Sequence, residues 1–173
     1  SFDADAPGAV FWHEKGMVLW DLLEDFGQQL RREHGFVKIK TPMMAKSKLW
    51  VTSGHWDHYR DDMFKFTVDE DEIYCLKPMD CPFNIKIFQT GQKSYRDLPI
   101  RYTEIGHVFR NEQSGELNGL FRVREITQDD SHVMCREDQV GAEIQNLLSA
   151  VKKYYAKLGL VPAYFLSTMP DDH

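Results

Sequence analysis

The chain has 173 residues, of which 42% are hydrophobic and 13% aromatic, and its formal net charge is -6. This composition is typical of a folded globular chain, which at this length buries roughly 70% of its unfolded surface. No apolar run approaches the roughly 18 residues of a membrane-spanning helix, so we expect no membrane partner. The three cysteines are an odd number and indicate a reducing compartment, so we expect a cytoplasmic protein.

The first part of the chain predicts a long helix followed by a strand. Apolar residues recur at helical spacing from about Lys15, and Gly35 is placed to end this amphipathic helix. Residues 36–40 (FVKIK) then alternate between apolar and polar side chains, which predicts a strand. The strand is expected to end by Pro42, because proline has no N–H to donate to a neighbouring strand.

The next part of the chain predicts two short helices with a loop and a strand between them. Ser47 is expected to cap the first helix, and residues 54–64 (GHWDHYRDDMF) are expected to form a loop after it. Residues 72–76 (EIYCL) predict a strand. Asp80 is expected to cap the second helix, which runs through Phe88.

Residues 100–132 predict two strands joined by a polar loop from about Asn111 to Leu120. On the second strand, the even positions share one face and carry mostly polar groups. An ordinary half-buried strand leaves such a face in water, which is the first interpretation. A covered face would need a ligand, because a buried unpaired charge costs several kcal/mol. The residues of this row are Arg122, Arg124, Ile126, Gln128, Asp130 and His132.

The last part of the chain predicts the longest helix and one more strand. Apolar residues follow a helical stripe from Val140 to Leu158, and Gly159 is expected to end the helix. Residues 163–168 (AYFLST) predict a strand. Helices mixed with hairpin-connected strands predict an α+β fold in which helices flank an antiparallel β-sheet. The chain shows no repeat and no low-complexity linker, so we expect residues 1–173 to form one domain.

Arg110, Glu112 and Arg122 bracket the polar loop in a way that suits a polyphosphate nucleotide. A planar guanidinium binds phosphate oxygens with two parallel hydrogen bonds and stabilises charge that develops during phosphoryl transfer. Glu112 can accept a hydrogen bond from an exocyclic amine such as that of adenine. The alternative is an ordinary Arg–Glu pair at the surface. The glycine motifs of P-loop and Rossmann nucleotide sites are absent from the sequence.

Cys81 and His132 are candidate metal ligands, although they lie too far apart in the sequence for a zinc finger. Lone residues of these two types are more often core residues than ligands. A catalytic zinc normally has three protein ligands and one open position, so these two do not complete a site.

His55 follows Gly54 in the predicted loop, beside Trp56. A histidine has a near-neutral unperturbed pKa and can relay protons. A solvated loop histidine is the more common case, and both interpretations remain open.

Several stretches of the sequence resemble the catalytic core of the threonyl-tRNA synthetase family, a branch of the class II aminoacyl-tRNA synthetases. The stretch GFVKIKTPMM resembles motif 1 of class II enzymes, whose proline, here Pro42, lies at the interface of a homodimer. The pattern FRNE…RVRE resembles motif 2. The pair KPMDC and QDDSH is more specific and separates this family from its seryl and prolyl relatives. The matching stretches are APGAVFWHEKG, KTPMM, LWVTSGHWDHY, LKPMDCP, KSYRDLPIR, FRNEQSG and RVREITQDDSH.

The resemblance implies ATP-dependent ligation of L-threonine to tRNA(Thr) through a threonyl-adenylate, with Mg²⁺ accompanying the ATP. Arg110 would contact the α-phosphate and be catalytic, and Glu112 would lie near the adenine. Arg122 would point toward the γ-phosphate. His55 is the further catalytic candidate, for transfer of the threonyl group to the tRNA.

The resemblance also implies a threonine site that uses Zn²⁺. Cys81 and His132 would be two of the zinc ligands, and the zinc would assist recognition of the amine and hydroxyl of threonine. Gln128 and Asp130 would line the same site. The chain departs from the family after Pro82, where Phe83 and Asn84 stand in place of the Gly-His that often follows the Cys-Pro of the zinc motif.

Motif 3, with its ATP-binding arginine, and the third zinc histidine have no counterpart in the sequence. We therefore interpret residues 1–173 as a class II catalytic core that is truncated before motif 3. One alternative is a non-catalytic paralogue that acts as an RNA-binding or regulatory module. Another is a class II ligase for a different amino acid, which the candidate zinc ligands argue against.

Overall fold

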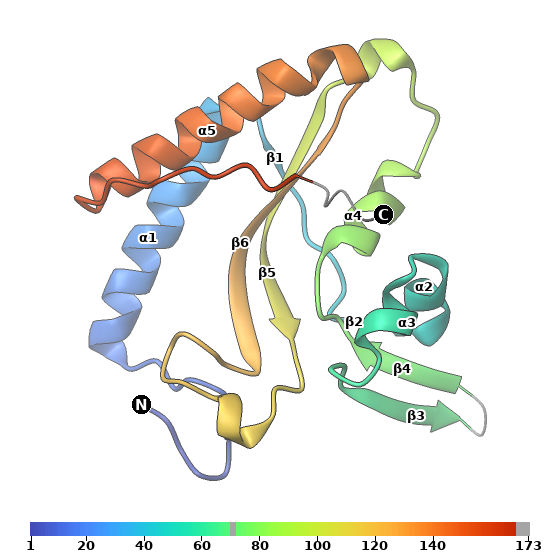
Figure 1. The fold of residues 1–173 in the computed structure, drawn as a ribbon, viewed down its shortest axis with the longest axis vertical. Helices are drawn as coiled ribbons and strands as arrows, with labels where there is room; N and C mark the ends of the chain where they lie inside the picture. Colours follow the sequence, from blue (N-terminus) through green and yellow to red (C-terminus); the bar gives the residue numbers. More distant parts are fainter. Residues whose placement is uncertain (70–71, 169–173) are drawn as a thin grey trace.

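A computed structural model describes residues 1–69 and 72–168 of the chain (Figure 1). No helix in these ranges has an apolar stretch that could cross a membrane. The helices are α1 (Glu14–Glu33), α2 (Ser47–Thr52), α3 (His55–Tyr59), α4 (Cys81–Phe88) and α5 (Val140–Lys157). The strands are β1 (Val37–Lys38), β2 (Met44–Lys46), β3 (Lys65–Asp69), β4 (Glu72–Leu76), β5 (Ile100–Phe109) and β6 (Glu125–Met134).

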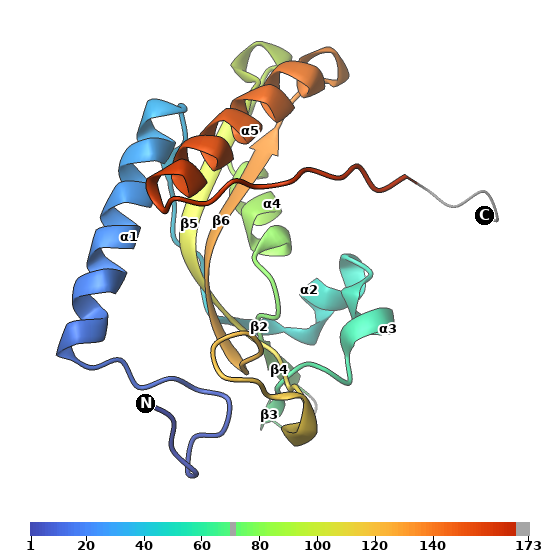
Figure 2. The ribbon, with the colours of Figure 1, turned by 60° about the vertical axis from the view of Figure 1, so that its left-hand side comes forward.

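The larger sheet has the strand order β1-β5-β6. Strands β5 and β6 pair antiparallel from Ile100 opposite Met134 to Phe109 opposite Glu125. The short β1 runs parallel to β5, with Val37 opposite Tyr102. Helices α1 and α5 cover one face of this sheet, and α4 lies on the other side (Figures 1 and 2). The α+β class predicted from the sequence is confirmed, with one parallel strand pair added to the antiparallel ones.

Ion pairs tie α1 and α5 to the covered face of this sheet. The buried guanidinium of Arg31 in α1 pairs with Asp129 of β6. Arg101 of β5 donates two hydrogen bonds of 2.6 Å to the buried carboxylate of Glu143 in α5. Such two-pronged Arg–carboxylate contacts fix geometry as well as adding energy. The odd-numbered positions of β5 and β6 therefore face the two long helices.

The smaller sheet, of order β2-β4-β3, is antiparallel and forms a second packing unit with α2, α3 and α4. Its buried cluster consists of Trp50, Met63, Cys75 and Phe83. The rings of Trp50 and Phe83 meet edge to face with their centroids 5.7 Å apart, a favourable arrangement for aromatic pairs. This cluster anchors α4, the helix that begins at Cys81.

Residues 54–64 contain α3, so the prediction of a loop there was wrong. Gly54 has a φ of 77°, a left-handed conformation that ends α2 and redirects the chain. Trp56 then packs against the buried cluster, so burial of an aromatic ring stabilises a helix of only one turn. The predicted cap was also wrong, because Ser47 is the first helical residue and the cap position is Lys46.

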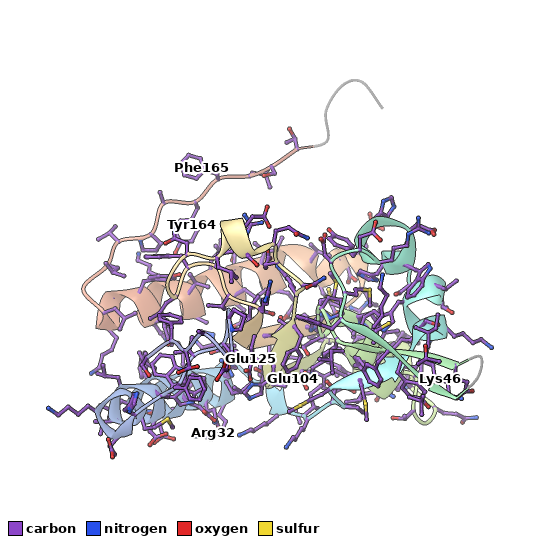
Figure 3. All side chains as sticks on the ribbon, turned by 90° about the horizontal axis from the view of Figure 1, so that it is seen from below. Arg32, Lys46, Glu104, Glu125, Tyr164 and Phe165 are labelled. Carbon is purple, nitrogen blue, oxygen red and sulfur yellow. The ribbon has the colours of Figure 1, made fainter. Side chains whose placement is uncertain are left out.

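Strands β2 and β3 were not predicted, and the strand predicted at residues 163–168 is absent. This segment is extended but pairs with no other strand among the described residues. A strand is stabilised by hydrogen bonds and side-chain contacts with a neighbour, which this segment lacks. Phe165 is accordingly 92% exposed, and Figure 3 shows Tyr164 and Phe165 on a segment that extends away from the helices.

The second strand of the central hairpin begins at Glu125, and not near position 122 as predicted. Asn118 and Arg122 instead form an isolated bridge that closes a tight turn, with Gly119 at a φ of 50° inside it. Arg122 and Arg124 therefore lie in the connection before β6. The common face predicted for the even positions holds for the part of the row that lies in β6.

Candidate functional site

The candidate threonine and zinc residues come from α4 and β6. Cys81 is the first residue of α4, whereas Asp130 and His132 lie two positions apart on β6 and share a face of the strand. Oδ2 of Asp130 lies 3.7 Å from Nδ1 of His132. Burial raises the pKa of the Cys81 thiol, and the negative charge of Asp130 raises it further.

Gln128 lies on the same face of β6, opposite Gly106 of β5. Asp130 is opposite Glu104 and His132 is opposite Tyr102 on that strand. Cross-strand neighbours point to the same face of a sheet. Helix α4 lies on this face, so the row of polar side chains is partly covered and not fully solvated. This favours the interpretation of the row as a ligand site over that of a solvated outer face.

The donor atoms present fit two positions of a zinc site. Nδ1 of His132 is buried and has no hydrogen-bond partner among the described residues. A thiolate sulfur and an imidazole nitrogen are the donors that zinc prefers in proteins. The described part of the chain contains no group of three or more His, Cys, Asp or Glu side chains that could hold a metal. Further ligands would therefore have to come from outside the described residues.

The candidate ATP residues surround the connection between β5 and β6. Arg110 directly follows β5, and its Nε donates a hydrogen bond of 3.3 Å to the carbonyl oxygen of Pro78. Nε of Arg122 lies 2.9 Å from Oε2 of Glu112. The two side chains thus form the ordinary Arg–Glu pair that was the alternative to a nucleotide site. The Arg122 side chain is nevertheless 51% exposed, so a ligand could reach it.

Arg124 is held in place by the start of the chain. Its backbone N–H donates to the carbonyl oxygen of Gly8 at 2.7 Å, and its Nε donates to the carbonyl oxygen of Glu112 at 3.0 Å. A Cβ at Gly8 would lie 2.8 Å from Cγ of Arg124. The irregular first residues thus pack against the segment that carries the candidate ATP residues, a role that the sequence did not reveal.

His55 contacts other residues of its own region. Its Nδ1 lies 2.7 Å from Oγ of Ser53. Its ring centroid is 6.2 Å from the rings of Trp50 and Tyr59. None of these contacts joins His55 to the other candidate site residues, so its catalytic role stays a prediction.

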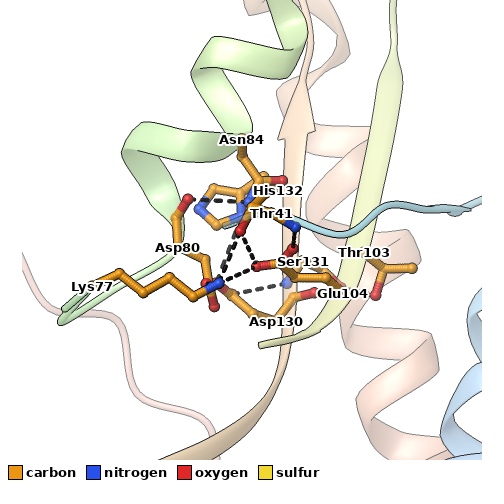
Figure 4. Close-up of polar contacts among 9 residues, drawn as sticks. All are labelled: Thr41, Lys77, Asp80, Asn84, Thr103, Glu104, Asp130, Ser131 and His132. Carbon is orange, nitrogen blue, oxygen red and sulfur yellow. Dashed lines mark hydrogen bonds and ion pairs between the residues drawn. The ribbon is translucent and has the colours of Figure 1, made fainter. Parts of the chain in front are cut away.

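A buried polar cluster surrounds the ammonium group of Lys77 (Figure 4). Nζ of Lys77 lies 2.8 Å from Oγ1 of Thr41, 3.0 Å from Oε1 of Glu104 and 2.6 Å from Oδ1 of Asp80. Lys77, Asp80 and Glu104 are 2%, 0% and 3% exposed. Thr41 also donates to Glu104 twice, from its backbone N–H and its hydroxyl, at 2.8 Å each.

The sequence analysis assigned only a capping role to one member of this cluster, Asp80. Asp80 occupies the cap position of α4, but its side chain makes no capping hydrogen bond and faces Lys77 instead. The available signal was a Glu in the middle of a predicted strand and a Lys three positions before an Asp. Ionised side chains are almost never fully buried unless they are paired.

The two carboxyl groups of the cluster, Asp80 and Glu104, have pKa values that are shifted in opposite directions. Burial raises the pKa of Asp80 to about 7, with a hydrogen bond to Glu104 as the next cause. Burial alone would raise the pKa of Glu104 as well, but hydrogen bonds involving Asp80, Lys77 and Thr41 outweigh it and lower the pKa. Glu104 therefore carries the negative charge that pairs with Lys77, and Asp80 is the group that takes up a proton.

Gly106 is required by the close approach of α4 to β5. A Cβ at this position would lie 2.1 Å from Oδ2 of Asp80. We expect Gly106→Ala to lower the free energy of unfolding by about 1–3 kcal/mol, because neither the strand nor the buried carboxylate has room to move. Chemical denaturation measures this, with Gly115→Ala as the control.

Gly115 is exposed and nothing lies within 4 Å of a Cβ built on it. Its replacement should change the free energy of unfolding by no more than about 0.5 kcal/mol. Equal stability of the two variants would contradict the tight packing of Asp80 against β5.

A separate cavity of about 500 Å³ is lined in part by Trp12, Trp20 and His107. It is also lined by Glu125 and Thr127, odd-numbered residues of β6, so it lies on the α1 side of the sheet. None of the candidate site residues lines it. The candidate site is therefore distinct from this cavity.

The chain matches a known family of catalytic domains. Residues 64–172 match the family described as tRNA synthetase class II core domain (G, H, P, S and T). The chain is 46% identical over 170 residues to the Threonine--tRNA ligase of Leptothrix cholodnii, which covers 98% of this chain and 26% of that protein. It is 44% identical over 168 residues to the Threonine--tRNA ligase of Methylococcus capsulatus, covering 96% and 26%. The chain thus spans only 26% of the length of these relatives.

A solved structure supports the same similarity. The fold resembles a crystal structure described as the RNA binding domain of threonyl-tRNA synthetase from Cryptosporidium parvum Iowa II, with a TM-score of 0.88 and 41% sequence identity. The match covers 92% of this chain and 40% of that one. At this identity and TM-score, the two chains share a fold over the matched residues.

Proposed function

This chain belongs to the class II tRNA synthetase core family, and we propose that residues 1–173 form the part of a threonine–tRNA ligase catalytic core that precedes motif 3. The reaction is ATP-dependent ligation of L-threonine to tRNA(Thr) through a threonyl-adenylate. The observation that carries the proposal is the position of the Asp130 carboxylate, 3.7 Å from His132 and on the face of the larger sheet on which α4, the helix that begins at Cys81, lies. These three residues belong to the KPMDC and QDDSH stretches, the most family-specific ones in the sequence.

The nucleotide half of the site consists of Arg110, Glu112 and Arg122. Arg110 neutralises negative charge at the α-phosphate as the carboxylate of threonine attacks it, and Mg²⁺ accompanies the ATP. When ATP binds, the guanidinium of Arg122 leaves the carboxylate of Glu112 and contacts the γ-phosphate instead. The Arg122 side of this pair is 51% exposed, and ion pairs in contact with solvent contribute only about 0–1 kcal/mol, so the exchange costs little on the side of Arg122. Glu112 is then free to accept a hydrogen bond from the amine of adenine.

The amino-acid half of the site consists of Gln128 and Asp130, with Cys81 and His132 as the residues that would hold Zn²⁺. When bound, the zinc supplies open positions that the amine and the hydroxyl of threonine can fill. Asp130 accepts a hydrogen bond from the hydroxyl, and Gln128, two positions before it on the same face of β6, lines the pocket beside it.

The partners in this proposal are tRNA(Thr) and, in the full-length enzyme, a second copy of the chain in the cytoplasm. The proposed homodimer is supported by α1, the helix that precedes Pro42. This helix exposes apolar side chains of Val18, Leu19 and Leu22, each about 60% accessible. A contiguous exposed apolar face of this kind is typical of an interaction surface.

The proposed function is tested by threonine-dependent exchange of pyrophosphate into ATP, and by charging of tRNA(Thr), with the full-length enzyme that carries this chain. We expect both activities. A folded full-length protein that performs neither would support the non-catalytic paralogue. Exchange that depends on another amino acid would support a ligase of different specificity.

His55 is expected to act in the second step of the reaction only. If its imidazole takes the proton from the ribose hydroxyl, His55→Ala should slow threonyl transfer to tRNA by about 10²-fold and leave pyrophosphate exchange nearly unchanged. Single-turnover transfer from preformed adenylate measures the first quantity. His58→Ala is the matched control, because His58 is an exposed histidine of the same helix. Equal slowing of both steps would make His55 a structural residue of α3.

A further inference from the structure

We propose that Lys77 is a positioning residue that holds both halves of the site in register through the segment 77–81. The inference rests on the proposed function, because it uses Arg110 and Cys81 in the roles given above. It goes beyond that function because Lys77 contacts neither of the proposed substrates. Lys77 acts through the backbone and side chains to which it is bound.

The ammonium group of Lys77 connects three segments that are distant in the sequence. Its three contacts go to Thr41 after β1, to Glu104 in β5 and to Asp80 at the start of α4. An ammonium group has three N–H donors, so each contact uses one of them. Figure 4 shows Lys77 reaching the group of acceptors from one side, while Thr41 and Glu104 approach from other elements.

The backbone of the same segment contacts the nucleotide half of the site. Lys77 donates its N–H to Met43 and accepts from the N–H of Phe109, at 2.9 and 2.8 Å. The next carbonyl, that of Pro78, accepts the hydrogen bond from Arg110. A shift of residues 77 and 78 would therefore change the direction of the guanidinium that we place on the α-phosphate.

The other end of the segment, at Asp80, positions Cys81 in the amino-acid half of the site. Asp80 is bound by Lys77 and is directly followed by Cys81, the first residue of α4. The side chain of Asn84, one turn further, donates to the carbonyl oxygen of Asp80 at 3.2 Å. The side chain and backbone of Lys77 together therefore contact Asp80, Glu104 in β5, and Phe109 at the end of β5 that precedes Arg110.

The cluster of Lys77, Glu104, Thr41 and Asp80 fixes the positions of its members more than it stabilises the fold. Replacing a buried ion pair with neutral groups of similar volume is often neutral or stabilising, whereas removing one partner alone is strongly destabilising. The distinguishing variant is therefore charge-matched: Lys77→Met combined with Glu104→Gln. It removes the ammonium contacts without leaving an ionised Glu104 unpaired in the interior.

The experiment compares this double variant with Arg101→Met/Glu143→Gln in the full-length enzyme. The control removes a partly buried ion pair that also involves β5 but joins it to α5, away from the segment 77–81. Three quantities are measured: thermal unfolding, the KM for threonine in pyrophosphate exchange, and the absorption spectrum of bound Co²⁺ as a probe of the metal ligands. Misplacement of a reactive group by about 1 Å costs about 10²-fold, so we expect a rise of about 10–100-fold in the KM of the Lys77 variant.

The Lys77 variant should also show a weakened or altered cysteine–Co²⁺ absorption while remaining folded, and the control should show neither change. A folded Lys77 variant with the wild-type KM and spectrum would overturn the inference. So would equal changes in both variants, because they would indicate a general effect of lost stability. A wild-type enzyme that binds no Co²⁺ would refute the zinc site of the proposed function, and the KM of the variant would then still decide the role of Lys77.

Discussion

Replacing Arg110 with alanine in the full-length enzyme should slow threonyl-adenylate formation by about 10²–10³-fold. This is the typical cost of losing one preorganised group that stabilises charge in a transition state. The structure gives a reason to expect preorganisation: Arg110 follows β5 directly, and its backbone N–H donates to Arg124 at 2.9 Å while its side chain donates to Pro78. The guanidinium is thus oriented before any nucleotide is bound.

The rate of adenylate formation is measured by pyrophosphate exchange at saturating threonine and ATP. Arg136→Ala is a suitable control, because Arg136 is a second arginine beside the same sheet whose side chain pairs with the exposed Asp138. We expect the control to keep its rate within about twofold, as is usual for an exposed ion pair. A near wild-type rate for Arg110→Ala would show that motif 2 has been assigned to the wrong residues.

The helices were the part of the fold that the sequence predicted best. Helix α1 spans Glu14–Glu33 and α5 spans Val140–Lys157, within two residues of the predicted ends. Both carry an apolar stripe of helical period and are ended by a glycine, signals that are local in the sequence. The short α3 lacks a stripe, and its stability comes from packing of Trp56 against a cluster formed by other elements.

Strands were predicted less well, because their stability depends on pairing. The long hairpin of β5 and β6 was predicted from its alternation, yet Arg122 was placed in the strand and lies in a turn. Strand β3 was missed, although it pairs with the predicted β4. Residues 163–168 have the composition of a strand but no neighbour among the described residues. Alternation thus identifies a segment that is able to pair, and the fold determines whether it does.

Some residues of the candidate site were identified from the sequence, and others became visible only in the fold. Motif residues such as Cys81 and His132 were found by resemblance, because the family pattern records residue identity at fixed positions. The Lys77–Glu104–Thr41 cluster has no such local signature, since its members come from three segments that are distant in the sequence and meet only in the folded chain. Its signals in the sequence were a carboxylate in the middle of a predicted strand and a Lys three positions before an Asp, and neither indicates which residues meet.

Cys81→Ala in the full-length enzyme should lose both the bound zinc and the ability to activate threonine. The variant removes one of the two ligands that we propose on this chain and leaves the buried Nδ1 of His132 without the metal. Metal analysis should give one zinc per chain for the wild type and almost none for the variant. Cys135→Ala is the matched control, because Cys135 is also a half-buried free cysteine and directly follows β6. It should keep the metal and the activity.

The same site should separate threonine from valine by chemistry and not by size. The two amino acids are nearly isosteric, and a pocket that reads size alone gains only about 10–200-fold per methylene. A site built to bind a hydroxyl rejects an analogue without one by about 10⁴–10⁵-fold, and Asp130 beside His132 is placed to bind the threonine hydroxyl. Serine keeps the hydroxyl and lacks only a methyl group, so it should be activated appreciably. Pyrophosphate exchange with the three amino acids decides this, and zinc-free enzyme that still prefers threonine over valine would overturn the proposed role of the metal.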